Sequence, residues 1–177
     1  MKNVIIMNGS GEAGKDTLCD FAKEQYPVMN VSSIDPIKQI AEQVGWDGTK
    51  DPKSRKFLSD LKKISTDYNE FPTEYLVSKF LQFMCTGEDR SSNVEEIMFV
   101  HIREPKEIDK FINRITYYEN CIRIRKVLVT RGEEKELGNE SDDGVRNYDY
   151  DFIFENNGTL EEAKEKWLNE VLPKVLS

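Results

Sequence analysis

Two glycines and a lysine near the amino terminus have the spacing of a phosphate-binding loop. Gly9 is followed, after four residues, by Gly14 and Lys15 in the order G-x-x-x-x-G-K. In such a loop successive backbone N–H groups surround a phosphate, and the lysine adds a mobile positive charge. Glycine lets the backbone approach the phosphate closely. We expect the bound phosphates to be contacted by Gly9, Gly11, Glu12, Ala13, Gly14, Lys15, Asp16 and Thr17.

The residues on either side of the loop support this interpretation. Residues 4–7 form a short apolar run typical of a buried strand, and Leu18, Phe21 and Ala22 follow the loop at helical spacing. A strand before the loop and a helix after it are the context that the motif requires. The positive end of the helix dipole would add to the attraction for phosphate. A plain glycine turn is the alternative.

The residue after the lysine is Asp16, where a serine or threonine commonly binds Mg²⁺, and a hydroxyl follows at Thr17. The sequence GKDT resembles the loop of nucleoside monophosphate kinases. It is most similar to the GKD form of phage-type deoxynucleoside monophosphate kinases and animal-type phosphomevalonate kinases. The resemblance implies ATP as phosphoryl donor with Mg²⁺, and Asp16 and Thr17 as the residues nearest the metal. Alternatively, Asp16 only favours the helix dipole.

Length and composition limit the class of protein. The chain of 177 residues suits a single domain, 1–177, and a net charge of -8 argues against general binding to nucleic acid or anionic membranes. Three scattered cysteines favour a reducing, cytoplasmic setting. No apolar run is long enough to span a bilayer. We expect a monomer or homodimer whose partners are small-molecule nucleotides.

Strand and helix patterns alternate along the chain. The predicted strands are 4–7, 28–31, 97–100, 122–129 and 152–154. Prolines at 36 and 105 suit helix starts, with Asp35 as an N-cap, and Thr159 with Glu162 forms a capping box before the last helix. Alternation of this kind favours a parallel sheet. We therefore predict an α/β fold, a three-layer α/β/α sandwich of the P-loop NTPase type with a five-stranded parallel sheet.

A helical excursion at about 46–90 separates the second and third strands. Its two expected apolar faces are Phe57, Leu58, Leu61, Ile64 and Tyr68, and then Leu76, Phe80, Phe83 and Met84. The excursion resembles the acceptor-binding subdomain of nucleoside monophosphate kinases. The segment DPIKQIAEQVGWDGTKDPKSRKFL resembles the acceptor region of deoxynucleotide kinases, which implies acceptor roles for Asp35, Lys38 and Arg55. A guanidinium also suits a phosphate, whereas most of the lysines here are expected on a solvated face. These lysines are Lys50, Lys53, Lys56, Lys62 and Lys63.

The third predicted strand ends in His101-Ile102-Arg103, where the kinases in question carry Asp-Val-Arg. His101 therefore replaces an acidic metal ligand, so Mg²⁺ would depend on phosphates, water and Asp16. A lone histidine is also compatible with a structural role, although ligands gather at the carboxyl ends of parallel strands. Arg103, just past the strand, is expected to contact the acceptor.

Two later segments complete the predicted site. The acidic stretch at about 131–149 lies where nucleotide kinases have a lid, and its arginines, Arg131 and Arg146, could approach the transferring phosphates. A surface loop is the alternative. The turn containing Asn156 and Gly158 resembles the loop that lies against the donor adenine in dephospho-coenzyme A kinases, although both residues are also ordinary turn formers.

Together these features predict phosphoryl transfer from ATP to a nucleoside or deoxynucleoside monophosphate. Lys15, Arg103 and Arg131 would neutralise the transferring phosphate, and no protein nucleophile is needed. Two alternatives stay open. One is a kinase of another small phosphorylated metabolite, such as phosphomevalonate, and the other is a nucleotide-binding protein without turnover, which the missing strand-end acid permits.

Overall fold

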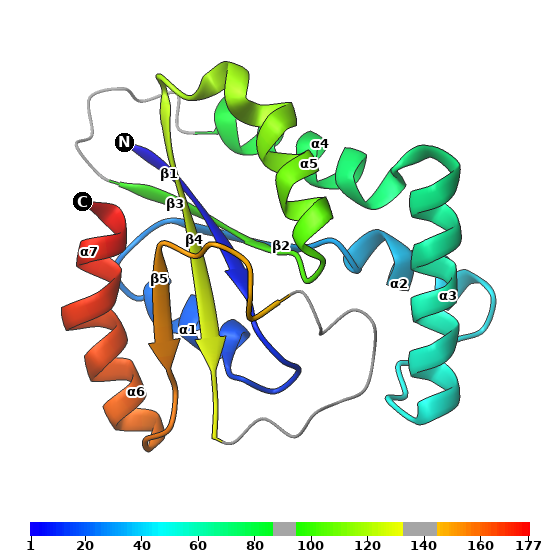
Figure 1. Cartoon of the computed structure of the whole chain (residues 1–177), viewed down its shortest axis with the longest axis horizontal. Helices are drawn as coiled ribbons and strands as arrows, with labels where there is room; N and C mark the ends of the chain where they lie inside the picture. Colours follow the sequence, from blue (N-terminus) through cyan, green and yellow to red (C-terminus); the bar gives the residue numbers. More distant parts are fainter. Residues whose placement is uncertain (87–94, 133–144) are drawn as a thin grey trace.

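The computed structural model describes residues 1–86, 95–132 and 145–177, and within these ranges five strands form one parallel sheet. The strands are β1 (Lys2–Asn8), β2 (Val28–Ser32), β3 (Glu96–His101), β4 (Ile122–Thr130) and β5 (Phe152–Glu155). Their order across the sheet is β2-β3-β1-β4-β5, and every neighbouring pair is parallel. Helices cover both faces (Figure 1). The predicted three-layer α/β/α fold with a five-stranded parallel sheet is confirmed.

Each face of the sheet is covered by helices from separate parts of the chain. One face carries α1 (Lys15–Ala22) and the C-terminal run of α6 (Leu160–Lys166), the π-helical segment η2 (Trp167–Val171) and α7 (Leu172–Leu176). The other face carries α4 (Phe71–Cys85) and α5 (Pro105–Ile115), after which comes the short 3₁₀ turn η1 (Thr116–Tyr118).

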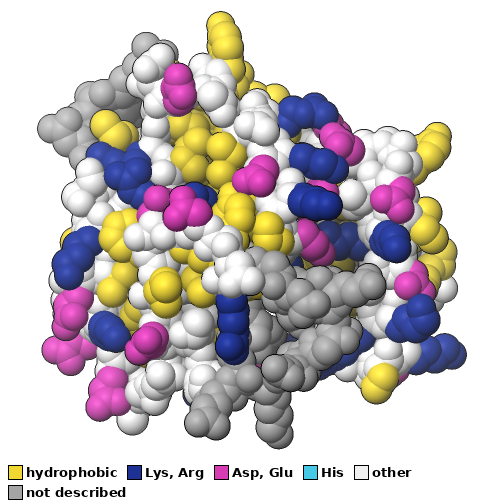
Figure 2. Space-filling model, in the orientation of Figure 1, with side chains coloured by type: hydrophobic (Ala, Val, Ile, Leu, Met, Phe, Trp, Pro, Cys, Tyr) yellow, Lys and Arg dark blue, Asp and Glu magenta, His cyan; other side chains and the backbone are white. Residues whose placement is uncertain are grey.

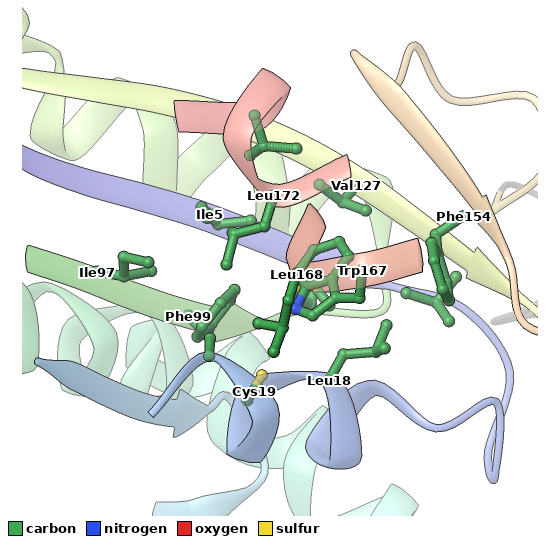
Figure 3. Close-up of a cluster of buried hydrophobic side chains, with 14 of the residues drawn as sticks. Ile5, Leu18, Cys19, Ile97, Phe99, Val127, Phe154, Trp167, Leu168 and Leu172 are labelled. Atoms are coloured by element: carbon green, nitrogen blue, oxygen red, sulfur yellow. The ribbon is translucent and has the colours of Figure 1, made fainter. Parts of the chain in front are cut away.

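The two hydrophobic cores follow from the alternation of side chains along β1. Ile5 and Met7 point into the first core, where the Trp167 ring packs edge-on against Phe154 with their centroids 5.5 Å apart (Figure 3). Val4 and Ile6 point into the second core, beneath α4 and α5. Alternation of this kind on a strand buried on both faces is expected at the centre of a parallel sheet. Packing on both sides therefore fixes the carboxyl end of β1, from which the glycine-rich loop emerges.

The helices between β2 and β3 differ in how they contact the sheet. After α2 (Asp35–Gln43), α3 (Pro52–Asn69) stands apart from the sheet at the right of Figure 1. No residue of α3 is buried, and its expected apolar face leaves Phe57, Ile64 and Tyr68 exposed by 38%, 66% and 85%. Figure 2 shows hydrophobic side chains along this outer edge. The apolar face predicted for α3 therefore contributes no residue to either core, and the helix packs mainly beside α4 and α2.

The helix α4, in contrast, belongs to the core. Leu76, Phe80 and Phe83 are buried against the sheet, with Met84 partly buried beside them. Its predicted apolar face is confirmed, and within the excursion it is α3 alone that has no buried residue.

Helix starts follow the predicted signals with one correction. The capping box of Thr159 and Glu162 is present in both directions. Asp35 is the first residue of α2, and Ile34 occupies the N-cap position that was predicted for Asp35. The Asp35 carboxylate instead accepts a hydrogen bond from the Ser32 N–H at 2.7 Å.

Among the residues that the structure describes, no helix combines the length and apolar character needed to cross a membrane.

Candidate functional site

The loop between β1 and α1 depends on glycine at two positions. Gly9 has φ 133° and Gly14, the N-cap of α1, has φ 95°, values that side-chain-bearing residues rarely adopt. A Cβ at Gly9 would overlap the backbone carbonyl oxygen of Val129, so the close approach of the loop to β4 also requires glycine. Glu12, in the middle of the loop, takes a φ of 68°, which indicates local backbone strain at a residue that is not glycine.

A buried asparagine ties the start of the loop to two other segments. The Asn8 side chain accepts from the Gly9 N–H at 2.7 Å and donates to the Arg103 carbonyl at 2.9 Å and to the Tyr150 hydroxyl at 2.8 Å. Asn8 was not predicted as a site residue, because it ends an apolar run and has no informative spacing. Its contacts fix the loop relative to the end of β3.

A second buried asparagine supports the other end of the loop. The Asn156 Nδ2 donates to the Ala13 carbonyl at 2.8 Å, and a Cβ at Gly14 would collide with the same amide nitrogen. The structure thus gives Asn156 a role beneath the phosphate loop, and its contact with a donor adenine stays a prediction, as does that of Gly158. The neighbouring Asn157 accepts from the Gly132 N–H at 2.6 Å, which places Arg131 beside the same turn.

Lys15 is positioned to meet a phosphate. It is the first residue of α1, and its ammonium donates to the carbonyls of Gly9 at 2.9 Å and Ser10 at 2.7 Å. A Cβ at Gly11 would meet nothing within 4 Å, so the loop is open on that side. Backbone N–H groups, a helix N-terminus and a flexible ammonium group around an open loop fit a bound polyphosphate.

The end of β3 carries a buried, neutral imidazole. The Nε2 atom of His101 lies 2.7 Å from Asn30 Oδ1, 3.6 Å from Asp16 Oδ1 and 3.7 Å from Cys19 Sγ. Burial lowers the pKa of His101 to about 4, although the nearby Asp16 carboxylate acts in the opposite direction. The imidazole is therefore uncharged at neutral pH and gives β3 no anionic metal ligand.

Oxygen ligands for Mg²⁺ are sparse on the protein itself. Within the described ranges no group of three or more His, Cys, Asp or Glu side chains could hold a metal ion. The Asp16 side chain, 87% exposed, and the partly buried Thr17 lie in the first turn of α1. Mg²⁺ commonly takes one or two protein oxygens together with substrate phosphates and water. Asp16 and Thr17 fit that mode of binding, which does not require a site made entirely of protein ligands.

Predicted acceptor residues on α2 lie on the same side as the loop. Burial raises the pKa of the half-buried Asp35, and the charge of Asp16 acts in the same direction, so the two carboxylates influence one another across the end of the sheet. Lys38, one turn later on the same helix, partly offsets this effect. Asp35 therefore lies at the carboxyl end of β2, and the acceptor roles of Asp35 and Lys38 stay predictions.

On α3 a second cation besides the predicted Arg55 has a defined contact with another element. Arg55, in the first turn of α3, is exposed, and its Nε donates to the carbonyl of Lys50, just before the helix, at 2.8 Å. Lys62 lies seven residues later on the same face, is only 13% exposed and pairs with Glu104 at 2.5 Å. The solvated face expected for most lysines of this segment does not include Lys62. Through Glu104 this side chain reaches the residue that follows Arg103.

The predicted lid at 131–149 can be followed only at its two ends, because 133–144 lie outside the described residues. Arg131 and Arg146 are both exposed. The chain after Arg146 is attached to the core, since the Tyr148 hydroxyl donates to Asp109 at 2.6 Å and Tyr150 accepts from Asn8. Arg146 thus lies four residues before a residue that contacts the start of the phosphate loop.

The sheet order, the parallel strands and the glycine-rich connection from β1 to α1 define this chain as a protein of the P-loop NTPase fold. Comparison with solved structures agrees. Dephospho-CoA kinase from Campylobacter jejuni is 16% identical, with a TM-score of 0.51 over 99% of this chain and 98% of that one. TT1252 from Thermus thermophilus is also 16% identical, with a TM-score of 0.50 over 98% and 97%.

A de novo designed protein with the P-loop NTPase fold is 13% identical over 100% of this chain and 94% of its own, with a TM-score of 0.42. No protein-family model matches this chain, and no curated protein matches it by sequence. At these identities the likeness establishes the fold, and the reaction has to be argued from the site.

Proposed function

We propose that this protein transfers a phosphoryl group from ATP to a small acceptor, with a nucleoside or deoxynucleoside monophosphate as the first candidate. The observation that carries the proposal is the open loop at Gly11 with the Lys15 ammonium held against the carbonyls of Gly9 and Ser10. The likeness to a dephospho-CoA kinase supports a kinase among the activities that this fold allows.

Each part of the site has a defined task in this proposal. Backbone N–H groups of the loop after Gly9 would bind the donor phosphates, and Lys15 would turn from its loop carbonyls to the transferring phosphate. Arg103 and Arg131 would stabilise the charge that develops during transfer. Mg²⁺, when bound with ATP beside Asp16 and Thr17, supplies further neutralisation of phosphate charge. The protein contributes positioning and charge, which suffices for phosphoryl transfer.

The acceptor would bind between α2, the start of α3 and the end of β3. Asp35, Lys38, Arg55, Arg103 and Arg146 are the residues that we assign to it from the sequence, and the half-buried Lys62 adds a further cation. A guanidinium or ammonium contact with the acceptor phosphate would offset the net negative charge of the chain.

A second candidate is transfer to a hydroxyl group of a metabolite that is not a nucleotide. The observation that favours it is Asp35, a half-buried carboxylate whose pKa is raised by burial and by Asp16. Such a carboxylate can accept a hydrogen bond or a proton from an attacking hydroxyl, whereas it repels an incoming phosphate. Phosphorylated metabolites such as phosphomevalonate remain acceptors to test in the same way.

The test is an ATP-dependent transfer assay with a panel of acceptors: nucleoside monophosphates, deoxynucleoside monophosphates, phosphomevalonate and hydroxyl-bearing cofactor precursors. We expect product with one acceptor class, and none with Lys15→Ala, which should fold normally because the ammonium donates to carbonyls of the loop itself. Full turnover in Lys15→Ala would remove the loop from the mechanism. ATP binding without transfer to any acceptor would favour a non-catalytic nucleotide-binding protein.

A cytoplasmic location and a monomeric or homodimeric state also remain predictions.

A further inference from the structure

A chain of polar contacts connects the buried end of β3 to the exposed first turn of α1. His101 Nε2 lies 2.7 Å from Asn30 Oδ1, and Asn30 Nδ2 donates to Asp16 Oδ1 at 3.4 Å. The amide of Asn30 therefore faces the imidazole with its oxygen and the carboxylate with its nitrogen. This arrangement requires the imidazole to donate from Nε2.

The strand order explains how the three residues meet. The strand β2 pairs with β3 in parallel register, and β1, which leads into the loop and α1, pairs with the other edge of β3. Asn30 on β2 pairs with Phe99, two residues before His101, and its amide contacts both His101 and the first turn of α1. The residue at the end of β3 is a histidine instead of an acid, and its imidazole reaches α1 through Asn30, the nearby Asp16 and the Cys19 thiol.

The Asp16 carboxylate has to be held in one orientation if it is to bind a metal ion. Its side chain is 87% exposed, and a free carboxylate near a polyphosphate would be repelled from it and would sample many rotamers. A hydrogen bond from an uncharged amide restrains the carboxylate without neutralising it. The remaining carboxylate oxygen stays available to a cation.

We propose that His101 and Asn30 are positioning residues that hold the Asp16 carboxylate where it can receive the Mg²⁺ of a bound nucleotide, in place of an acid at the end of β3. The inference deepens the proposed function, on which it rests for the presence of Mg²⁺ and ATP at the loop. Asp16 would contact the ion or its water, and Asn30 and His101 would act only through Asp16.

The experiment measures binding, with no turnover. The dissociation constant of ATP is measured by calorimetry over a series of Mg²⁺ concentrations, and Mn²⁺ replaces Mg²⁺ for detection of the bound ion by electron paramagnetic resonance. We expect Asp16→Asn and Asn30→Ala each to raise the Mg²⁺ concentration at half-effect by about three- to tenfold. The double variant should show no more than the larger single effect, because both changes act on one carboxylate.

Matched controls separate this effect from charge and folding. Asp20→Asn removes a carboxylate from the same helix, where it pairs with Lys23, and Ser32→Ala removes a polar group from the same strand as Asn30. Both should keep the wild-type Mg²⁺ dependence. His101→Gln retains an N–H donor for Asn30, so its Mg²⁺ concentration at half-effect should stay close to that of the wild type. His101→Leu has no such donor and should raise this concentration as Asn30→Ala does.

Two results would overturn the inference: a wild-type Mg²⁺ dependence in Asn30→Ala, or effects of Asp16→Asn and Asn30→Ala that multiply in the double variant. The glutamine and leucine variants at 101 give an independent test if Asn30→Ala does not fold. A wild-type protein that binds no ATP in the presence of Mg²⁺ would overturn the proposed function itself, and that outcome is visible before any variant is compared.

Discussion

Two glycines of the phosphate loop should separate the requirements of folding from those of ligand binding. Gly9→Ala introduces a Cβ onto the Val129 carbonyl oxygen at a φ of 133°, so both steric overlap and backbone strain oppose it. Overpacking and an unfavourable backbone conformation each cost about 1–3 kcal/mol, which gives an expected loss of about 2–6 kcal/mol in the free energy of unfolding. Gly11→Ala meets nothing within 4 Å and should change that free energy by less than about 1 kcal/mol.

The assay is urea unfolding of the ligand-free protein, followed by circular dichroism, together with ATP binding by calorimetry. Gly11→Ala should be as stable as the wild type and bind ATP at least tenfold more weakly, by roughly 1.4 kcal/mol, because its methyl group would occupy the open side of the loop. A wild-type stability for Gly9→Ala would refute the close-approach argument. Unchanged ATP affinity in Gly11→Ala would show that phosphates do not bind where we place them.

Three further predictions concern residues around the loop. Burial lowers the pKa of His101 from 6.5 to about 4, so the unfolded chain binds more protons than the folded one between these pH values. The free energy of unfolding should therefore fall from pH 7 to pH 5 by about 2 kcal/mol more in the wild type than in His101→Gln. Urea titration at each pH measures this difference. Asn156→Ala should cost about 1–3 kcal/mol in the same assay, since it leaves a buried carbonyl without its donor, and the exposed Asn157→Ala should cost less. Steady-state kinetics should show that Lys62→Ala raises the acceptor KM about tenfold and Arg55→Ala by less; the reverse order would place the acceptor at the other end of α3.

The architecture was predictable because it depends on local patterns. Apolar runs of strand length, prolines at helix starts and the capping box at Thr159 gave the number, type and parallel arrangement of the elements. The loop was predictable for the same reason, since its glycines are needed for backbone geometry at fixed spacing.

The side-chain network was not predictable, because it depends on which strands become neighbours. Asn30 and His101 meet only through the pairing of β2 with β3, and no pattern within either strand specifies that pairing. Periodicity likewise shows that Arg55 and Lys62 share a face of α3 but not which turn meets the rest of the molecule. Exposed apolar residues of α3, such as Tyr68, have the spacing of a core face and are not in one.

The central position of β1 has a consequence for how the chain folds during synthesis. Lys2 pairs with Glu96 on one side and Ile122 on the other, so β1 has no partner in the sheet until β3 and then β4 have been synthesised. The loop after β1 also rests on Val129. Pairings between such distant segments slow folding and leave apolar strands exposed in the interval. A nascent chain that stops before Ile122 would therefore contain every residue of the glycine-rich motif and still lack the strand against which the loop packs.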